Sequence, residues 1–218
     1  MADRFAAGRA YLRNADPVLA RLIDAHPDFD PRGWMKQLPT MDAYGALLFQ
    51  VIGQQLSVRA TRAILGRIEA QFGGRLPEPQ DIVDADPQRL RDAGLSRRKV
   101  ETLRVLAQRF AAGEFSDEMF RRSSDAEIQA ALTAIPGIGP WTVHGFLIIA
   151  LDRDDVIPTG DLALRRAVRR LYGLDGLPSE QQFLEIAERW RPYRSLATMY
   201  LFADEFEAQR PAGPGTPA

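Results

Sequence analysis

IPGIGPWTVHGFLIIALDRDDVIPTGDLALRR, the stretch Ile135–Arg166, places a glycine turn before one helical segment and an aspartate before the next. The turn is Pro136–Gly139, and the aspartate is Asp161. Glycines let the backbone turn tightly and come close to a ligand, because they carry no Cβ. The N–H groups and positive dipole end that open a helix suit a phosphate. The stretch therefore predicts a phosphate-binding hairpin, followed one helix later by a lone carboxylate.

Helical periodicity runs through the rest of the chain as well. Apolar residues recur at three- and four-residue spacing in the segments 19–23, 44–52, 58–68, 100–110, 141–151 and 193–208. Two capping boxes, Ser124 with Glu127 and Ser179 with Gln182, mark further helix starts. No segment alternates with the period of a strand. The pattern predicts an all-α fold.

The total charge does not indicate a nucleic-acid binder, because the 28 basic residues are balanced by 29 acidic ones. The basic residues are nevertheless clustered. Arg165, Arg166, Arg169 and Arg170 share one face of a predicted helix, Arg97, Arg98 and Lys99 begin another, and Arg189, Arg191 and Arg194 surround the last bend. Each cluster has a simple interpretation as a solvated helix face. A local basic surface can also bind phosphates on a protein of neutral total charge.

Several classes of site and location are disfavoured by composition. The chain has no cysteine, which excludes disulfides, thiolate zinc sites and cysteine-bound iron–sulfur clusters. Its two histidines, His26 and His144, lie far apart in sequence, which disfavours a histidine metal site. The longest apolar run, Gly145–Leu151, is far short of the ~20 residues that span a membrane. We expect a soluble, cytoplasmic chain whose Pro/Gly-rich tail, residues 210–218, is disordered.

The glycine turn has two interpretations. It is either an ordinary turn or the centre of a helix–hairpin–helix motif, in which backbone amides hold a phosphate without reading sequence. A capped helix before it and an apolar helix after it favour the second interpretation. No Lys-Ser/Thr pair follows the glycines, so the turn is not a P-loop.

Asp161 also has two interpretations. After Gly160 and before a helical segment, it makes a good N-cap, which is a structural role. Alternatively, its carboxylate faces an extruded nucleotide and stabilises positive charge on the sugar, or aligns water, as the glycosidic bond breaks. One carboxylate suffices when the departing base already carries a positive charge.

The residues of two stretches resemble a known family of enzymes. Ile135–Leu151 and Ile157–Val168 resemble the helix–hairpin–helix/Gly-Pro-Asp DNA glycosylases, within them the alkylbase (3-methyladenine DNA glycosylase II) branch. Three further motifs agree and follow in family order: Ile52–Val58, Gly94–Lys99 and Trp190–Ser195. The resemblance covers about Asp16 to Phe206.

This resemblance implies two interleaved helical lobes, with the hairpin and Asp161 at the cleft between them. Residues 36–153 would form the central lobe, and residues 1–35 with 154–209 the second. It also implies the roles of single residues. Asp161 would be catalytic, and Trp141 and Phe202 would stack on the base. Gln55 or Leu56 would fill the gap left by the extruded nucleotide. Contacts with DNA would come from Gly137, Ile138, Gly139, Arg97, Arg98 and Lys99, and a Na⁺ or K⁺ ion would be held by the backbone carbonyls of Thr133, Ile135 and Ile138.

Spacing alone gives Trp141 and Phe202 a second interpretation, as side chains of the core. Trp141 also occupies the position at which bifunctional relatives carry a lysine nucleophile. Without that amine no Schiff base forms, so we expect no lyase activity.

The sequence therefore predicts a monofunctional DNA glycosylase that excises alkylated purines, 3-methyladenine and 7-methylguanine, in base excision repair. We expect it to act as a monomer on double-stranded DNA, at a bacterial-type nucleoid, without a required cofactor. Two alternatives remain open: a glycosylase of the same fold for uracil, hypoxanthine or oxidised bases, and a non-catalytic helix–hairpin–helix module that binds DNA.

Overall fold

The computed structural model of the chain describes residues 4–33 and 41–209. Within these residues every regular element is a helix and no strand occurs, which confirms the predicted all-α fold. No helix in this part is long and apolar enough to cross a membrane. The tail that the sequence predicts to be disordered, residues 210–218, lies outside the described residues.

The chain forms two compact units, one of them discontinuous in sequence. The first comprises Met1–Pro39 with Arg153–Ala218, and the second is Thr40–Asp152. The sequence places the corresponding boundaries after residues 35 and 153, and the first of these falls outside the described residues.

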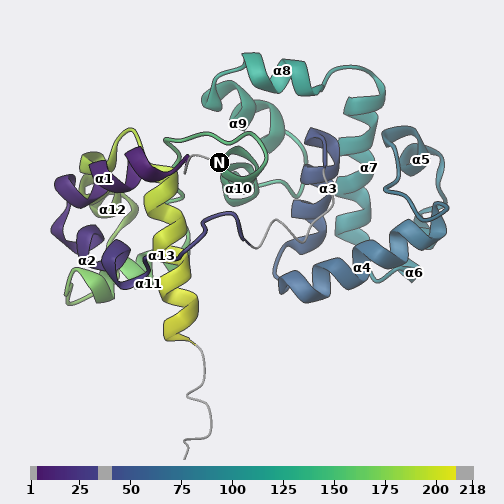
Figure 1. Cartoon of the computed structure of the whole chain (residues 1–218). Coiled ribbons are helices and arrows are strands. Elements are labelled where there is room, and N and C mark those ends of the chain that lie inside the picture. Colours follow the sequence, from purple (N-terminus) through teal and green to yellow (C-terminus); the bar gives the residue numbers. More distant parts are fainter. Residues whose placement is uncertain (1–3, 34–40, 210–218) are drawn as a thin grey trace, which may run out of the picture. The chain divides into compact units, whose positions relative to one another are not determined.

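The unit Thr40–Asp152 is built around the long helix α7, Arg97–Ala111. Its other helices are α3 (Ala43–Gly53), α4 (Val58–Gln71), α5 (Pro79–Asp84), α6 (Pro87–Asp92), α8 (Asp117–Arg122), α9 (Asp125–Thr133) and α10 (Pro140–Ile149). α7 packs against α3, α5 and α6, and α10 packs against α3 and α9 (Figure 1). Aromatic rings fill the core, with Phe120 between Phe110, Phe115 and Phe146 at centroid distances of 5.1–6.0 Å.

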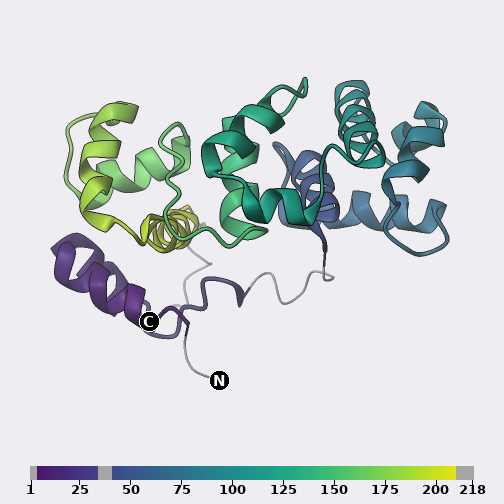
Figure 2. The same ribbon diagram turned by 90° about the horizontal axis from the view of Figure 1, so that it is seen from above.

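In the other unit, α1 (Ala6–Ala15), α2 (Pro17–Ala25) and α11 (Leu162–Leu171) pack against α13, Arg194–Ala208. α12 (Glu180–Ala187) packs against the 3₁₀ turn η2 (Glu188–Trp190), which also contacts α1. Figure 1 shows α13 as the long yellow helix, and Figure 2 shows it nearly end-on. The core joins residues from both ends of the chain, among them Leu19, Val168, Phe183, Trp190 and Leu201.

Capping residues set where the helices begin, as the sequence predicts. Asp16 accepts hydrogen bonds from the N–H groups of Val18 and Leu19 at the start of α2. Both predicted capping boxes form, at the starts of α9 and α12. Glycines with positive φ follow the ends of α4 and α7. Sequence patterning did not predict α5, α6 and α8, because six residues make fewer than two turns and show no period.

Candidate nucleic-acid interface and active site

The hairpin between α9 and α10 requires glycine at position 137 for two reasons. Gly137 has a φ of +94°, in the left-handed region that other residues avoid. A Cβ there would lie 2.2 Å from the Thr102 hydroxyl oxygen. The same hydroxyl donates a 2.8 Å hydrogen bond to the carbonyl oxygen of Pro136. The hairpin backbone therefore lies directly on α7.

The second glycine of the hairpin faces open space. A Cβ at Gly139 would have no heavy atom of the described residues within 4 Å. Gly139 is also the N-cap of α10, whose first-turn amides are the kind of donors that bind phosphate. The side chain of Ile138 is buried, so this residue offers its backbone and not its side chain. The turn thus exposes a backbone edge, as the helix–hairpin–helix interpretation requires.

The predicted cation site consists of three backbone carbonyls near this turn. The Ile135 carbonyl already accepts a 3.0 Å hydrogen bond from the N–H of Ile138. A carbonyl oxygen has two lone pairs, so this bond is compatible with a monovalent cation held together with Thr133. Residues 4–33 and 41–209 hold no cluster of three or more His, Asp or Glu side chains that would bind a metal. The cation stays a prediction.

The loop after α3 presents two exposed side chains, Gln55 and Leu56. Gln55 has a φ of +60°, which is unfavourable for a residue with a Cβ. Leu56 is 41% exposed, although it is a large apolar residue. Backbone strain and an exposed leucine are typical of a loop that meets a ligand. The role of Gln55 or Leu56 in filling the gap left by an extruded nucleotide stays a prediction.

The three basic residues at the start of α7 differ in their surroundings. Arg97 and Arg98 are exposed, and Arg97 forms a weak ion pair with Glu101 at 3.7 Å. The ammonium nitrogen of Lys99 instead lies 2.7 Å from the carbonyl oxygen of Ile52 and 2.8 Å from that of Gln54. Its partial burial lowers the pKa of Lys99. Two of the three donors of the Lys99 ammonium group are thus used within the protein, and its predicted contact with DNA stays a prediction.

The structure shows the capping role of Asp161, and its catalytic role stays a prediction. It is the N-cap of α11, with Oδ1 accepting a 3.0 Å hydrogen bond from the N–H of Leu164. Asp161 is only 8% exposed, so its carboxylate is largely shielded from water. A carboxylate has about four lone-pair positions, so capping does not exhaust its capacity to act on a substrate. The structural role and the catalytic role are compatible.

The segment that leads to Asp161 is tied to α13. Arg194 donates hydrogen bonds of 2.6 and 3.0 Å to the carboxylate of Asp155 and one of 2.8 Å to its carbonyl oxygen. Ser195 accepts a 3.0 Å hydrogen bond from the N–H of Val156. These contacts fix the chain a few residues before the cap, so that Asp161 stands on a rigid base.

The two predicted stacking aromatics occur in different units. Trp141, in the first turn of α10, is 49% exposed, which excludes the core interpretation for it. Phe202 is partly buried, packs against the core and stacks on Phe206 with ring centroids 5.9 Å apart and planes within 13°. The core interpretation thus holds in part for Phe202. The predicted base-binding role of both rings stays a prediction.

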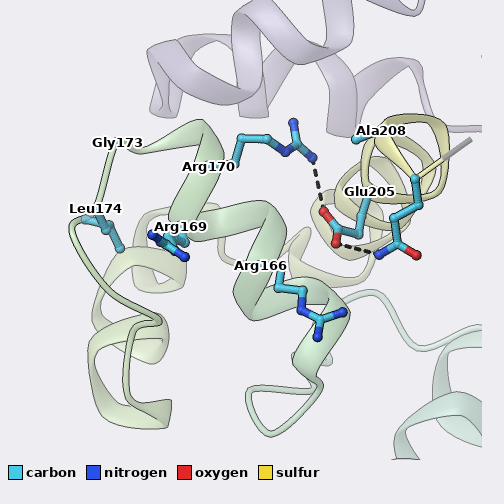
Figure 3. Close-up of a pocket in the computed structure, with 8 residues that line it drawn as sticks. Arg166, Arg169, Arg170, Gly173, Leu174, Glu205 and Ala208 are labelled. Atoms are coloured by element: carbon cyan, nitrogen blue, oxygen red, sulfur yellow. Dashed lines mark hydrogen bonds and ion pairs between the residues drawn. The ribbon is translucent and has the colours of Figure 1, made fainter. Parts of the chain in front are cut away.

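A basic cavity of about 660 Å³ opens beside α11 (Figure 3). Arg166, Arg169 and Arg170 line it. Arg170 is held by Asp204 at 2.6 Å and Glu205 at 3.2 Å, and the bond to Asp204 raises its pKa. Within the described part of the chain, Arg166 and Arg169 form no ion pair. The cavity therefore keeps a net positive charge that suits phosphate.

Sequence reasoning missed three residues that organise these elements: Gln54, Thr102 and Arg194. Gln54 was visible only as a neighbour of Gln55 in a motif. Thr102 lies in an apolar helical stripe, and Arg194 in a basic cluster. Their roles depend on long-range partners, which no local pattern records.

Comparison with known proteins gives consistent matches. A family model described as HhH-GPD superfamily base excision DNA repair protein matches residues 49–192. The chain is 34% identical over 194 residues to DNA-3-methyladenine glycosylase 1 of Schizosaccharomyces pombe, covering 88% of this chain and 84% of the relative. It is 29% identical over 174 residues to DNA-3-methyladenine glycosylase 2 of Escherichia coli, covering 76% and 58%.

The structural comparison points the same way. The solved structure of the Schizosaccharomyces pombe 3-methyladenine DNA glycosylase in complex with abasic DNA aligns with a TM-score of 0.84 and 31% identity. The alignment covers 95% of this chain and 100% of that one.

Proposed function

This chain belongs to the HhH-GPD superfamily of base excision DNA repair proteins, and on that premise we propose that it hydrolyses the N-glycosidic bond of alkylated purines in DNA. The substrates would be 3-methyladenine and 7-methylguanine. The product would be an abasic site, which is the form of DNA bound by the Schizosaccharomyces pombe relative.

The observation that carries this proposal is the open backbone edge at Gly139, at the start of α10. A turn that lacks a side chain there admits the close approach of a phosphate to the amides. Such contacts hold DNA without reading sequence, as an enzyme that searches for damaged bases requires. Arg97 and Arg98 would add phosphate contacts at the start of α7.

Asp161 would act on the extruded nucleotide. Methylation at N3 or N7 makes the purine cationic, so the C1′–N bond breaks with its electron pair moving to the base, which leaves neutral. Positive charge develops on the sugar, and a carboxylate in a nearly dry setting stabilises it. Water then adds to C1′ and loses its proton. The aromatic faces of Trp141 and Phe202 would favour a cationic base over a neutral one.

The lysine content supports the absence of lyase activity. The sequence has two lysines, Lys36 and Lys99, beside 26 arginines. The Lys99 amine is directed at the carbonyl oxygens of Ile52 and Gln54. Strand cleavage through a Schiff base needs a nucleophilic amine at the sugar. The proposal is therefore a monofunctional hydrolase.

The protein would act as a monomer on double-stranded DNA, at a bacterial-type nucleoid in the cytoplasm, with no required cofactor. A Na⁺ or K⁺ ion at the Thr133, Ile135 and Ile138 carbonyls would stiffen the hairpin without taking part in the chemistry.

The test is a release assay on methylated DNA, with the freed bases separated by chromatography. We expect 3-methyladenine and 7-methylguanine from the wild type, and neither from Asp161→Asn. Asparagine caps a helix about as well as aspartate, so this variant keeps its fold and its affinity for abasic DNA. Release of uracil, hypoxanthine or oxidised bases instead would favour the first alternative. Binding of DNA without any release would identify a non-catalytic module.

A further inference from the structure

One face of α7 contacts two loops that are far apart in sequence. Lys99 donates to the carbonyl oxygens of Ile52, in the last turn of α3, and of Gln54, just after it. Thr102, three residues along the helix, donates to the carbonyl oxygen of Pro136 in the hairpin. Residues three apart lie on the same helix face. α7 therefore holds both loops from one side.

The side chain of Gln54 joins the two loops directly. Its amide nitrogen lies 3.0 Å from the carbonyl oxygen of Gly137 and 2.9 Å from the hydroxyl of Thr142, as donor to both. The loop after α3, the hairpin and α7 thus form a closed ring of hydrogen bonds. Every member of this ring lies in the unit Thr40–Asp152, so it is a property of one compact body.

Lys99 and Gln54 hold the loop where it needs support. The Ile52 carbonyl is among the last of α3, which have no partner within the helix, and a cation is favourable at that end. Gln55 then adopts a φ of +60°, which costs about 1 kcal/mol for a residue with a Cβ. Contacts at the residue just before it offset this cost. The exposed side chains of Gln55 and Leu56 are consequently presented by a fixed backbone.

We propose that Lys99 and Gln54 are positioning residues that keep the Gln54–Leu56 loop at a set spacing from the phosphate-binding hairpin. This inference rests on the proposed function. While the hairpin holds the DNA backbone, the loop fills the space from which the nucleotide leaves. Loss of either residue lets the loop move relative to the hairpin. Extrusion of a paired nucleotide then becomes harder, whereas the chemical step on an extruded nucleotide is unchanged.

The test compares two duplexes with the same alkylated purine. In one the purine is normally paired, and in the other it lies opposite an abasic-site analogue, so that little pairing opposes extrusion. For Lys99→Met we expect the single-turnover excision rate to fall about tenfold more on the paired duplex, the effect of losing hydrogen bonds to a charged donor. Lys99→Arg keeps the charge and donors and restores most of the rate.

Two further variants separate positioning from folding. Arg104, also on α7, donates to the carbonyl oxygens of Val83 and Ala85 at the end of α5, away from both loops. Arg104→Met is therefore a matched control, because it also removes a cationic side chain that donates to backbone carbonyls. We expect it to reduce the excision rates on the two duplexes equally or not at all. Gln54→Leu removes the bonds to the hairpin but leaves the Lys99 contacts, and should show the same selective loss as Lys99→Met even if Lys99→Met does not fold.

The outcomes are distinct. An equal loss on both duplexes for Lys99→Met and Gln54→Leu would overturn the inference. So would a uniform loss of DNA affinity in Lys99→Met with a salt slope lower by about one, which would identify Lys99 as a phosphate contact. A wild-type protein that excises nothing from either duplex would instead refute the proposed function.

Discussion

The indole N–H of Trp190 donates a 2.9 Å hydrogen bond to the carboxylate of Asp16, 174 residues earlier in the chain. The same oxygen of Asp16 accepts a 2.6 Å bond from the Tyr172 hydroxyl, while the other caps α2. Burial, with this bond as a second cause, raises the pKa of Tyr172. One fully buried carboxylate therefore joins the N-terminal helices to the elements that follow Asp161.

We expect Asp16→Ala to lower the free energy of unfolding by about 3–5 kcal/mol, since it removes a helix cap and leaves two donors without an acceptor. Urea unfolding measures this change. Tyr172→Phe removes one donor and keeps the cap, so its cost should be about 1 kcal/mol. Equal effects of the two substitutions would contradict the central role given to Asp16.

The two glycines of the hairpin should respond differently to alanine. Gly137→Ala forces a left-handed residue against Thr102 and should cost about 2–4 kcal/mol of stability. Gly139 has a φ of −105° and open space around it, so Gly139→Ala should change stability by less than about 0.5 kcal/mol.

Gly139→Ala, which should leave stability nearly unchanged, should weaken DNA binding. The alanine methyl at Gly139 would stand where the phosphate approaches, and we expect about tenfold weaker binding of abasic DNA from a folded protein. Fluorescence anisotropy with a labelled duplex measures it. Unchanged affinity in Gly139→Ala would exclude this backbone edge from the DNA interface.

The sequence predicts those parts of the structure that are determined by residues close to one another in the chain. α2, α3, α4, α7 and α10 were predicted because apolar residues recur with the helical period within each of them, and glycines just after α4 and α7 mark where those two helices end. The hairpin was predicted from its two glycines and the helical segments beside them, although the structure requires only Gly137, through its φ and its contact with Thr102. The three six-residue helices carry no such period.

The residues of the candidate site show the limit of local patterns. Lys99 follows two exposed arginines, and only the position of the α3 carbonyls in the fold reveals that its amine turns inward. Gln54 and Gln55 are chemically identical neighbours. A change of backbone φ directs the first side chain to the hairpin and leaves the second exposed. Such differences depend on contacts between distant segments, such as Gln54 with Gly137.

The basic cavity beside α11 gives a prediction about salt dependence. If Arg166 and Arg169 each contact a DNA phosphate, the double substitution to glutamine should reduce the slope of log affinity against log salt by about 2. Arg13→Gln is the matched control in the same unit, because Arg13 is already paired with Asp24 at 2.7 Å. An unchanged slope in the double variant would assign the cavity no part in DNA binding.

The prediction that the protein has no lyase activity can be tested by borohydride trapping. Reduction captures a Schiff base between an amine and the opened sugar as a covalent protein–DNA adduct. We expect no adduct on a duplex from which the wild type releases its base.

Lys99 is the described residue that could contradict this prediction, because burial lowers its pKa and a neutral amine is nucleophilic. Its nitrogen is nevertheless bound to two carbonyl oxygens, and leaving them would break the contacts that support Gln55. An adduct that disappears in Lys99→Arg would show that the amine does reach the sugar. It would overturn both the monofunctional assignment and the internal role of Lys99.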